Sequence, residues 1–163
     1  ALGGAVLSNQ VQYSLAARSP ERAIVPWAQA NDRLVIAYSP LAQGFLSAKY
    51  DASNAPGGVR ATNPLFLPDN LARGAELLGA LRDVAKAHDA TPAQVALAWL
   101  VHKPNVVVIP GASSVDQLES NAAAADLDLT DDDAGRLTET SDRFSPRTGL
   151  AAAPELLRTR IRR

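Results

Sequence analysis

The chain has 163 residues, of which 47% are hydrophobic and 20% are charged, and its formal net charge is -1. This is the composition of a globular domain, and its near-neutral charge excludes a general attraction to nucleic acid or to an anionic membrane. The absence of cysteine excludes disulfides, thiolate catalysis and zinc–thiolate sites, and two histidines are too few for a histidine-rich metal site.

The start of the chain has no signal-peptide pattern, and the residues that follow predict a strand. Residues 1–10 lack the basic start and the long apolar core of a signal peptide, and no apolar run approaches the roughly 20 residues of a membrane span, so we expect a cytoplasmic protein without a membrane partner. Polar and apolar residues then alternate within residues 6–15. Val11 and Tyr13 are expected on one face of this strand and two glutamines on the other.

A helix, a second strand and a long loop follow. Ser19 is expected to be an N-cap, because proline and an acidic residue come next, and the helix should run to about Ala30. Residues 34–38 (LVIAY) predict the second strand. Residues 39–68 hold many prolines and glycines and little periodicity, and a loop of this length is usually functional.

Two helices are expected before the third strand. Residues 69–88 carry a leucine-rich stripe at helical spacing. Thr91 and Gln94 form a capping-box pattern around Pro92, which opens a helix to about His102.

The third strand leads into a candidate anion site. Residues 106–109 (VVVI) are a β-branched run typical of a strand buried on both faces, and Gly111 lets the backbone approach a ligand. Ser114 is expected to cap the next helix, with Gln117 completing a capping box. The unpaired N–H groups of a helix start can bind phosphate. The alternative is that these residues form an ordinary connection from a strand to a well-capped helix and bind no ligand.

The end of the chain predicts two more helices and a tail. The helix after Ser114 should end near Ala125, and Thr130 caps a further helix with three aspartates in its first turn. The pattern fades from Ser145, so residues 145–163, with a basic end at 158–163, form a tail that is helical or disordered.

Alternating strands and helices predict an α/β fold with a parallel sheet. Three strands fit either half of a doubly wound sheet or part of a (β/α)8 barrel. Neither a G-x-G-x-x-G nor a P-loop motif occurs. A phosphate site after the last strand is a feature that barrels often build after strands seven and eight.

Four blocks of the sequence, in order and at similar spacing, resemble the aldo/keto reductase family. They are residues 9–14 (NQVQYS), residues 37–44 (AYSPLAQG) with Lys49 and Tyr50, residues 91–99 (TPAQVALAW), and residues 109–113 (IPGAS) with Gln117 and Asn121. The resemblance implies that residues 1–144 are the C-terminal portion of a (β/α)8 TIM barrel, about three β/α units comprising strands six to eight. It also implies NADPH-dependent reduction of aldehydes or ketones.

The resemblance implies a cofactor-binding role for eleven residues: Gln10, Tyr38, Ser39, Pro40, Leu41, Gln43, Lys49, Gly111, Ser113, Gln117 and Asn121. Gln10 would hold the nicotinamide carboxamide and Tyr38 would stack on the ring. Residues 39–43 would wrap the pyrophosphate, Lys49 would close over the phosphates, and residues 111–121 would hold the adenosine and its 2′-phosphate. Arg60 is a second basic candidate.

Several of these residues also have ordinary structural explanations. Tyr38 could be a plain strand-end aromatic, Lys49 a solvated lysine and Gln117 only a capping residue. Ser120 stands where many family members have a glutamate, and residues 111–121 contain no arginine or lysine to pair with a 2′-phosphate. These departures make the preference for NADP(H) over NAD(H) weaker than the resemblance implies. On the resemblance we still expect NADP(H) as the cofactor, with NAD(H) less favoured.

The family's catalytic Asp, Tyr, Lys and His have no counterpart in this sequence, so the chain alone is expected to be inactive. Three hypotheses follow. The chain is the C-terminal part of an NADP(H)-dependent aldo/keto reductase, whose small carbonyl substrate needs the full-length enzyme. It is an NADPH-binding or regulatory module without turnover. Or it is a half-barrel remnant that self-associates through exposed strand edges.

Overall fold

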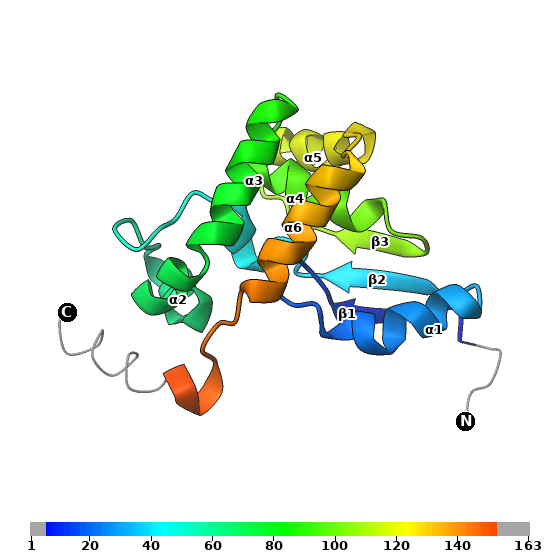
Figure 1. The fold of residues 1–163 in the computed structure, drawn as a ribbon, viewed down its shortest axis with the longest axis horizontal. Helices are drawn as coiled ribbons and strands as arrows, with labels where there is room; N and C mark the ends of the chain where they lie inside the picture. The colour runs from blue at the N-terminus through cyan, green and yellow to red at the C-terminus, as the bar shows by residue number, and fades with distance from the viewer. Residues whose placement is uncertain (1–5, 153–163) are drawn as a thin grey trace.

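A computed structural model describes residues 6–152, which contain one parallel sheet of three strands. The strands are β1 (Ser8–Gln12), β2 (Leu34–Tyr38) and β3 (Val106–Ile109), in the spatial order β1-β2-β3 (Figure 1). All three predicted strands are therefore confirmed. The central strand pairs on both sides, whereas β1 and β3 each have one edge without a strand partner among the described residues.

Residues 6–152 also form six α-helices and six short 3-10 helices. The α-helices are α1 (Ile24–Ala30), α2 (Pro68–Arg73), α3 (Ala75–Ala87), α4 (Pro92–Val101), α5 (Val115–Ala122) and α6 (Asp131–Arg143). The 3-10 helices are η2 (Ser19–Arg22), η3 (Ala42–Ser47), η4 (Gly58–Thr62), η5 (Pro64–Phe66), η6 (Ala123–Asp126) and η7 (Gly149–Ala152). None of the helices in this part of the chain is long and apolar enough to cross a membrane.

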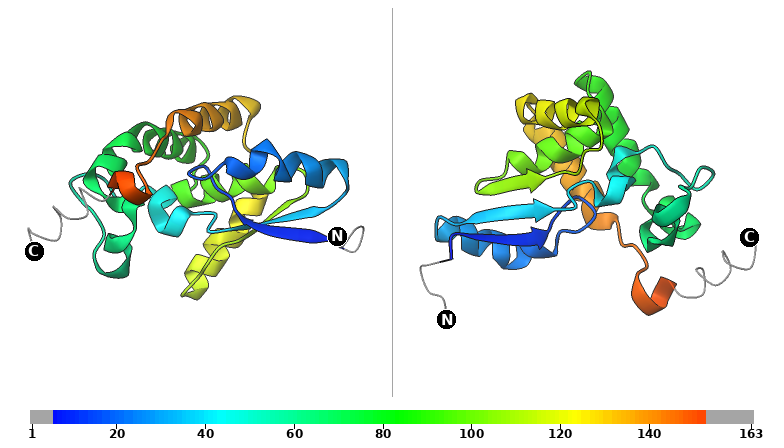
Figure 2. Two further views of the ribbon diagram at one scale, coloured as in Figure 1. Left: turned by 90° about the horizontal axis from the view of Figure 1, so that it is seen from below. Right: turned by 180° about the vertical axis from the view of Figure 1, so that it is seen from behind.

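The helices cover one face of the sheet. In Figure 2, α1, α3, α4 and α6 lie on one side of the strands, while α5 extends toward the other side. On the covered face, Val35, Ala37 and Val106 are buried against the helical layer. Helix α4 is the centre of that layer, since every residue from Val95 to Leu100 is buried.

The opposite face of the sheet is open. Val107 is 39% exposed and Ile109 is 47% exposed, and no described segment covers them. The prediction that residues 106–109 are buried on both faces is therefore wrong for this chain. A β-branched run marks a strand that suits burial on both sides, but the second covering layer is not supplied by residues 6–152.

The expected helix from Ser19 to Ala30 is divided in two. Ser19 lies inside η2, whose N-cap position is Arg18 and has no side-chain capping bond, so the prediction of a Ser19 cap is wrong. Ala23, with φ -148°, separates η2 from α1. Arg18 bonds through its guanidinium to Glu21 three residues later, a spacing that fits the tighter 3-10 turn.

The expected helix over residues 69–88 is also divided, at Gly74, which separates α2 from α3. A Cβ atom at Gly74 would lie 2.5 Å from Cζ of Phe45. Phe45 is buried and stacks on Phe144 with ring centroids 5.2 Å apart. Glycine therefore lets the helix start pass directly over an aromatic cluster.

The capping predictions at Thr91 and Thr130 are confirmed. Thr91 and Gln94 form both bonds of the capping box at α4, and Thr130 accepts from the backbone N–H of Asp133 at α6.

The described part of the expected tail is attached to α2. The side chain of Asn70 donates to the Arg147 carbonyl oxygen at 2.8 Å and accepts from the Arg147 N–H at 2.7 Å. The basic end at 158–163 lies outside the described residues, as do residues 1–5.

Candidate functional site at the carboxyl edge of the sheet

The three parallel strands end at the same edge of the sheet. Their register places Gln12 beside Tyr38, and Tyr38 beside Ile109. Tyr38 is 40% exposed on the open face. Gln10 pairs with Ile36 two residues earlier, so its exposed amide lies on the same face as the Tyr38 ring. The structure thus brings together the two residues predicted to contact a nicotinamide.

Gln12 belongs to the same site by position, although it was not among the eleven predicted residues. It lies directly opposite Tyr38 on the open face. The alternation that puts Gln10 and Gln12 on one side of β1 was the available signal.

The chain leaves β2 through a turn with several left-handed residues. Ser39 has φ 50°, Ala42 has φ 49° and Gln43 has φ 58°. Non-glycine residues in this region are uncommon and concentrate at functional sites. Pro40 is buried and Leu41 packs against the core, so these two predicted residues shape the turn from beneath. Ser39 and Gln43 are more accessible.

Gln43 ties this turn to the long loop that follows. Its side-chain oxygen accepts from Nδ2 of Asn63 at 2.9 Å, and its carbonyl oxygen accepts from Nε of Arg60 at 3.2 Å. Arg60 therefore lies beside this turn, and its role as a second basic residue of the site stays a prediction. Asn63 was missed, because its partner is 20 residues away and no local pattern marks such a contact.

Lys49 is exposed at the start of the same loop. Its carbonyl oxygen accepts from the Asn54 side chain at 3.2 Å. Its ammonium group takes part in none of the ion pairs of residues 6–152, so its charge remains accessible to an anion.

The turn before α5 is organised by its own side chains. Ser114 caps the helix as predicted, with its Oγ accepting from the Gln117 N–H at 3.2 Å. The Gln117 side chain accepts from the N–H and the hydroxyl of Ser113, at 2.8 and 3.0 Å. The expected reciprocal bond of the capping box is thus shifted by one residue. Asn121 reaches back to the Gly111 carbonyl at 3.5 Å.

The four predicted residues thus form two hydrogen-bonded pairs between the turn and α5, Ser113 with Gln117 and Gly111 with Asn121. A Cβ atom built at Gly111 would meet nothing within 4 Å, so packing does not require glycine there. Asp116 lies in the first turn of α5, and its negative charge opposes a phosphate dianion at this helix start.

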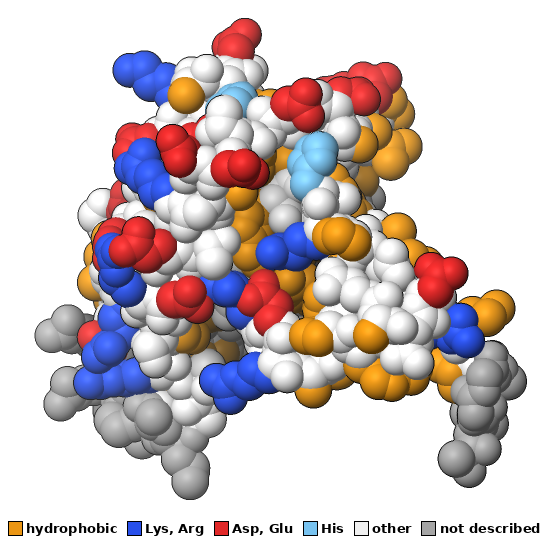
Figure 3. Space-filling model, turned by 45° about the vertical axis from the view of Figure 1, so that its right-hand side comes forward, with side chains coloured by type: hydrophobic (Ala, Val, Ile, Leu, Met, Phe, Trp, Pro, Cys, Tyr) orange, Lys and Arg blue, Asp and Glu red, His pale blue; other side chains and the backbone are white. Residues whose placement is uncertain are grey.

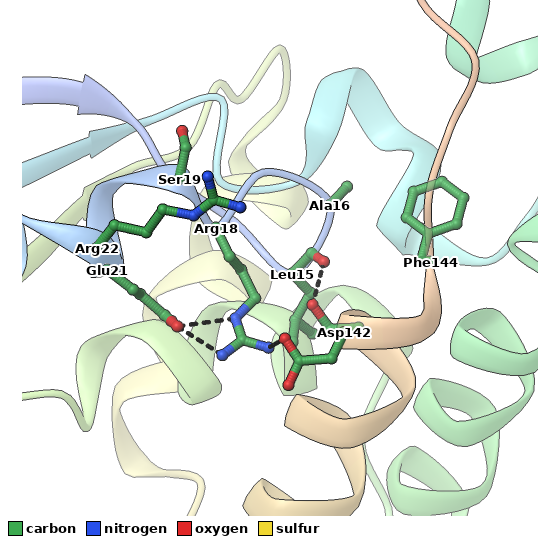
Figure 4. A pocket seen from close by; sticks show the side chains of 9 residues that line it. Leu15, Ala16, Arg18, Ser19, Glu21, Arg22, Asp142 and Phe144 are labelled. Carbon is green, nitrogen blue, oxygen red and sulfur yellow. Dashed lines mark hydrogen bonds and ion pairs between the residues drawn. The ribbon is translucent and has the colours of Figure 1, made fainter.

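A second cluster of polar residues lies elsewhere, around a pocket of about 400 Å³ between the β1–η2 connection and the end of α6 (Figure 4). The Arg18 guanidinium lies between the carboxylates of Glu21 and Asp142, with bonds of 2.5 and 2.7 Å. It also donates to the Thr138 carbonyl oxygen at 2.9 Å. Arg18 thus joins η2 to α6.

Glu21 is the centre of this cluster. Burial alone would raise the pKa of its carboxyl, but bonds from Arg18 and Tyr13 hold that pKa below its usual range. Burial, together with the 2.6 Å bond to Glu21, raises the pKa of the Tyr13 phenol. The charges of this cluster are paired with one another, which indicates that the cluster stabilises the packing of η2 against α6. The Arg18-x-x-Glu21 spacing was its only signal in the sequence.

Charges on the helical side of the molecule are mixed. Figure 3 shows basic and acidic side chains interspersed across the face in view, without a broad basic patch. Pairs such as Arg136 with Asp83 at 2.5 Å account for much of this pattern.

Comparisons with known proteins identify the family of this chain. The model of the aldo/keto reductase family matches residues 3–142. An uncharacterised oxidoreductase of Mycobacterium tuberculosis is 51% identical over all 163 residues. The NADH-specific methylglyoxal reductase of Escherichia coli is 29% identical over 134 residues, which are 82% of this chain and 41% of that protein.

A solved aldo/keto reductase of Klebsiella pneumoniae, in complex with NADP and acetate, superposes with a TM-score of 0.63 at 30% identity. The match covers 91% of this chain and 43% of that one. The chain belongs to the aldo/keto reductase family. It spans about half the length of the relatives it matches, 50% in the case of the mycobacterial protein.

Proposed function

We propose that this chain is the C-terminal, cofactor-binding part of an NADP(H)-dependent aldo/keto reductase that reduces aldehydes or ketones. In this proposal β1, β2 and β3 are strands six to eight of a (β/α)8 barrel. The supporting observation is that Tyr38, the glutamines of β1 and the accessible end of β3 meet at one edge of the sheet. Active sites of barrels lie at this carboxyl edge.

The dinucleotide, when bound, would supply the hydride. Gln10 has a side-chain donor and an acceptor for the carboxamide, and Tyr38 offers a ring face for the nicotinamide. The turn at Ser39, Pro40, Leu41 and Gln43 and the charge of Lys49 suit the pyrophosphate. The turn of Gly111, Ser113, Gln117 and Asn121 suits the adenosine end.

The chain's own residues orient the cofactor and leave the acid chemistry to groups outside it. Tyr13 is buried against Glu21, and the raised pKa of its phenol opposes ionisation, so it is unsuited to proton transfer at a carbonyl. We therefore propose no turnover by this chain alone, and a small carbonyl substrate only for the full-length enzyme. A cytoplasmic location belongs to the same proposal, on the basis of composition.

A second cofactor choice has a specific observation in its favour. Residues 111–121 contain no arginine or lysine, and Asp116 adds a negative charge at the start of α5. Both features suit the free 2′-hydroxyl of NAD(H) better than the 2′-phosphate of NADP(H). NADP(H) remains our first proposal, on the family resemblance.

Calorimetry tests the proposal. This chain would be titrated with NADPH and with NADH, both alone and joined to the half of the mycobacterial relative that it does not match. We expect the joined protein to bind NADPH and to reduce methylglyoxal with it, whereas the isolated chain gives no turnover. Failure of the folded, joined protein to bind either dinucleotide would refute the proposal. Tighter binding of NADH would select the second cofactor.

If the isolated chain binds NADPH saturably, the result favours the hypothesis that it is an NADPH-binding or regulatory module without turnover. A Tyr38→Ala variant should weaken binding in whichever protein binds. Trp27→Ala is the matched control, because this aromatic side chain on α1 is also exposed, at 51%.

A further inference from the structure

The segment that follows α6 is fixed to α2 by a buried amide. Asn70 is fully buried, and its side chain makes three hydrogen bonds. Its Nδ2 donates to the carbonyl oxygens of Pro64, at 2.7 Å, and Arg147, at 2.8 Å, and its Oδ1 accepts from the Arg147 N–H at 2.7 Å. A buried amide is costly unless its groups are paired, so these bonds fix the side chain in one orientation. Asn70 thereby holds together two segments that lie far apart in the sequence.

The first of these segments leads directly to the turn after β2. Pro64 follows Asn63, whose Nδ2 donates to the side-chain oxygen of Gln43 at 2.9 Å. The side-chain oxygen of Asn63 also accepts from the Leu65 N–H at 2.9 Å, which caps η5. The position of the Asn63 amide therefore depends on the peptide groups that follow it, and Asn70 holds the carbonyl group of Pro64.

The second segment, residues 144–149, reaches the same turn through an aromatic pair. Phe144 stacks on Phe45 with ring centroids 5.2 Å apart. Phe45 is fully buried and belongs to η3, as Gln43 does. The contacts therefore close a ring that runs through Gln43, Asn63, Pro64, Asn70, Arg147, Phe144 and Phe45.

The turn at one end of this ring has an uncommon backbone conformation. Gln43 has φ 58°, in the left-handed region. This conformation is unfavourable for a residue with a side chain, and it persists only where the surrounding structure holds it. The loss of a contact in the ring therefore favours relaxation of Gln43 toward an ordinary, negative φ.

We propose that Asn70 is a positioning residue that couples segment 144–149 to dinucleotide binding, by holding the turn at Gln43 in its left-handed form. The proposal rests on the proposed function, because it takes this turn as the site of the pyrophosphate. The coupling is reciprocal. A dinucleotide that binds the left-handed turn stabilises the ring and with it segment 144–149, and an ordered segment strengthens dinucleotide binding.

The side chain of Arg147 supplies a matched control. Its Nη1 lies 3.4 Å from Oδ2 of Asp69, and the two side chains are 54% and 37% exposed. This ion pair also ties segment 144–149 to α2, but exposed ion pairs contribute little. Arg147→Ala removes the ion pair and keeps the backbone N–H and carbonyl groups that Asn70 binds.

Calorimetry of the joined protein, with whichever of NADPH and NADH binds more tightly, tests the coupling. Asn70→Ala should weaken binding about fivefold or more, whereas Arg147→Ala should change the dissociation constant less than about twofold. Asn63→Ala interrupts the ring at a less buried residue, and it serves if circular dichroism shows that Asn70→Ala does not fold. The double variant should bind about as weakly as Asn63→Ala, because both substitutions interrupt the same set of contacts.

Amide hydrogen exchange gives a readout that a purely structural role of Asn70 would not change. The dinucleotide should slow exchange in segment 144–149 of the wild type and of Arg147→Ala, and should slow it much less in Asn63→Ala, which keeps the bonds of Asn70. If the wild type binds the dinucleotide without a change in this segment, or a folded Asn70→Ala binds as tightly as the wild type, the coupling is refuted and the proposed function stands. If the folded wild type binds neither dinucleotide, the proposed function fails and the coupling fails with it.

Discussion

At Gly74 the fold leaves no room for a side chain. A methyl group there would lie 2.5 Å from Phe45 and 3.3 Å from both the Asn70 carbonyl oxygen and the Phe144 ring. Phe45 cannot move aside, because it is fully buried and also contacts Phe66 at 6.1 Å between ring centroids. Gly74→Ala should therefore lower the free energy of unfolding by about 1–3 kcal/mol, measured by urea denaturation.

Gly79, five residues later in α3, is the matched control. A Cβ atom at this position would meet nothing within 4 Å. Gly79→Ala should raise the free energy of unfolding by about 0.5–1 kcal/mol through helix propensity. The prediction fails if both substitutions change stability in the same direction.

Substitution of Gly111 can show whether glycine is needed at this position for ligand binding or for folding. Its surroundings leave room for a methyl group, so Gly111→Ala should change the free energy of unfolding by less than about 0.5 kcal/mol. If that room belongs to the dinucleotide, the same substitution should weaken NADPH binding by the joined, full-length protein. Calorimetry with an unchanged dissociation constant would remove Gly111 from the site.

Glu21 makes stability depend on pH in the acid range. Because the fold holds the pKa of its carboxyl below the ordinary value of 4.5, the ionised form is favoured in the folded state. Its contribution is present above the unfolded pKa and is lost as the pH falls through the folded one. Glu21→Gln should lower stability at neutral pH and flatten the decline in acid.

Urea unfolding at a series of pH values would measure this slope for the wild type and for Glu21→Gln. Asp142→Asn is the comparison, since its more exposed carboxylate, at 66%, meets the same Arg18. A decline in acid that is equally steep in wild type and Glu21→Gln would contradict the assignment.

At the scale of elements, α4 depends on its cap. This helix is the central layer under the sheet, and Thr91 supplies the side-chain bond to its third N–H at 3.2 Å. Thr91→Ala should cost about 1 kcal/mol of unfolding free energy, whereas Thr91→Ser keeps the hydroxyl and should cost less. Thermal unfolding of the two variants side by side gives the difference, and equal losses would show that the hydroxyl is not responsible.

Sequence patterns predicted the elements well where their causes are local. The caps at Thr91, Ser114 and Thr130 lie within three residues of their partners, and the strands follow from short runs of apolar residues. The failures involve distant partners. Ser19 lies inside a 3-10 turn whose preceding residue, Arg18, is also bonded to the distant Thr138 and Asp142 on α6. The helix over 69–88 is divided where Gly74 passes over Phe45.

The residues of the candidate site also fall into those that the sequence could indicate and those that it could not. The resemblance indicated Tyr38 and the 111–121 turn, and strand register explains why they share one edge of the sheet. Asn63 could not be found, because its bond to Gln43 spans a loop without periodicity. The shifted bond of Gln117 could not be foreseen either, since Ser113 and Ser114 are equivalent in a capping pattern.

Within the molecule as a whole, one face of the sheet is buried under helices and the other is exposed. The helical side buries Val35 and Ala37 completely, and its ion pairs join distant elements, as Arg18 does with Asp142. The open face has apolar residues without a covering layer. Among residues 6–152, the two faces of the sheet therefore differ in how completely their side chains are packed.

Amide hydrogen exchange of the free chain in dilute solution should reveal this asymmetry. Residues 34–38 of β2 are bonded on both sides and should exchange slowly, whereas residues 8–12 of β1 have one bonded edge and should exchange faster. If β1 is protected as strongly as β2 in the free chain, a contact outside this sheet covers the second edge of β1, and the expected difference between the two strands is refuted.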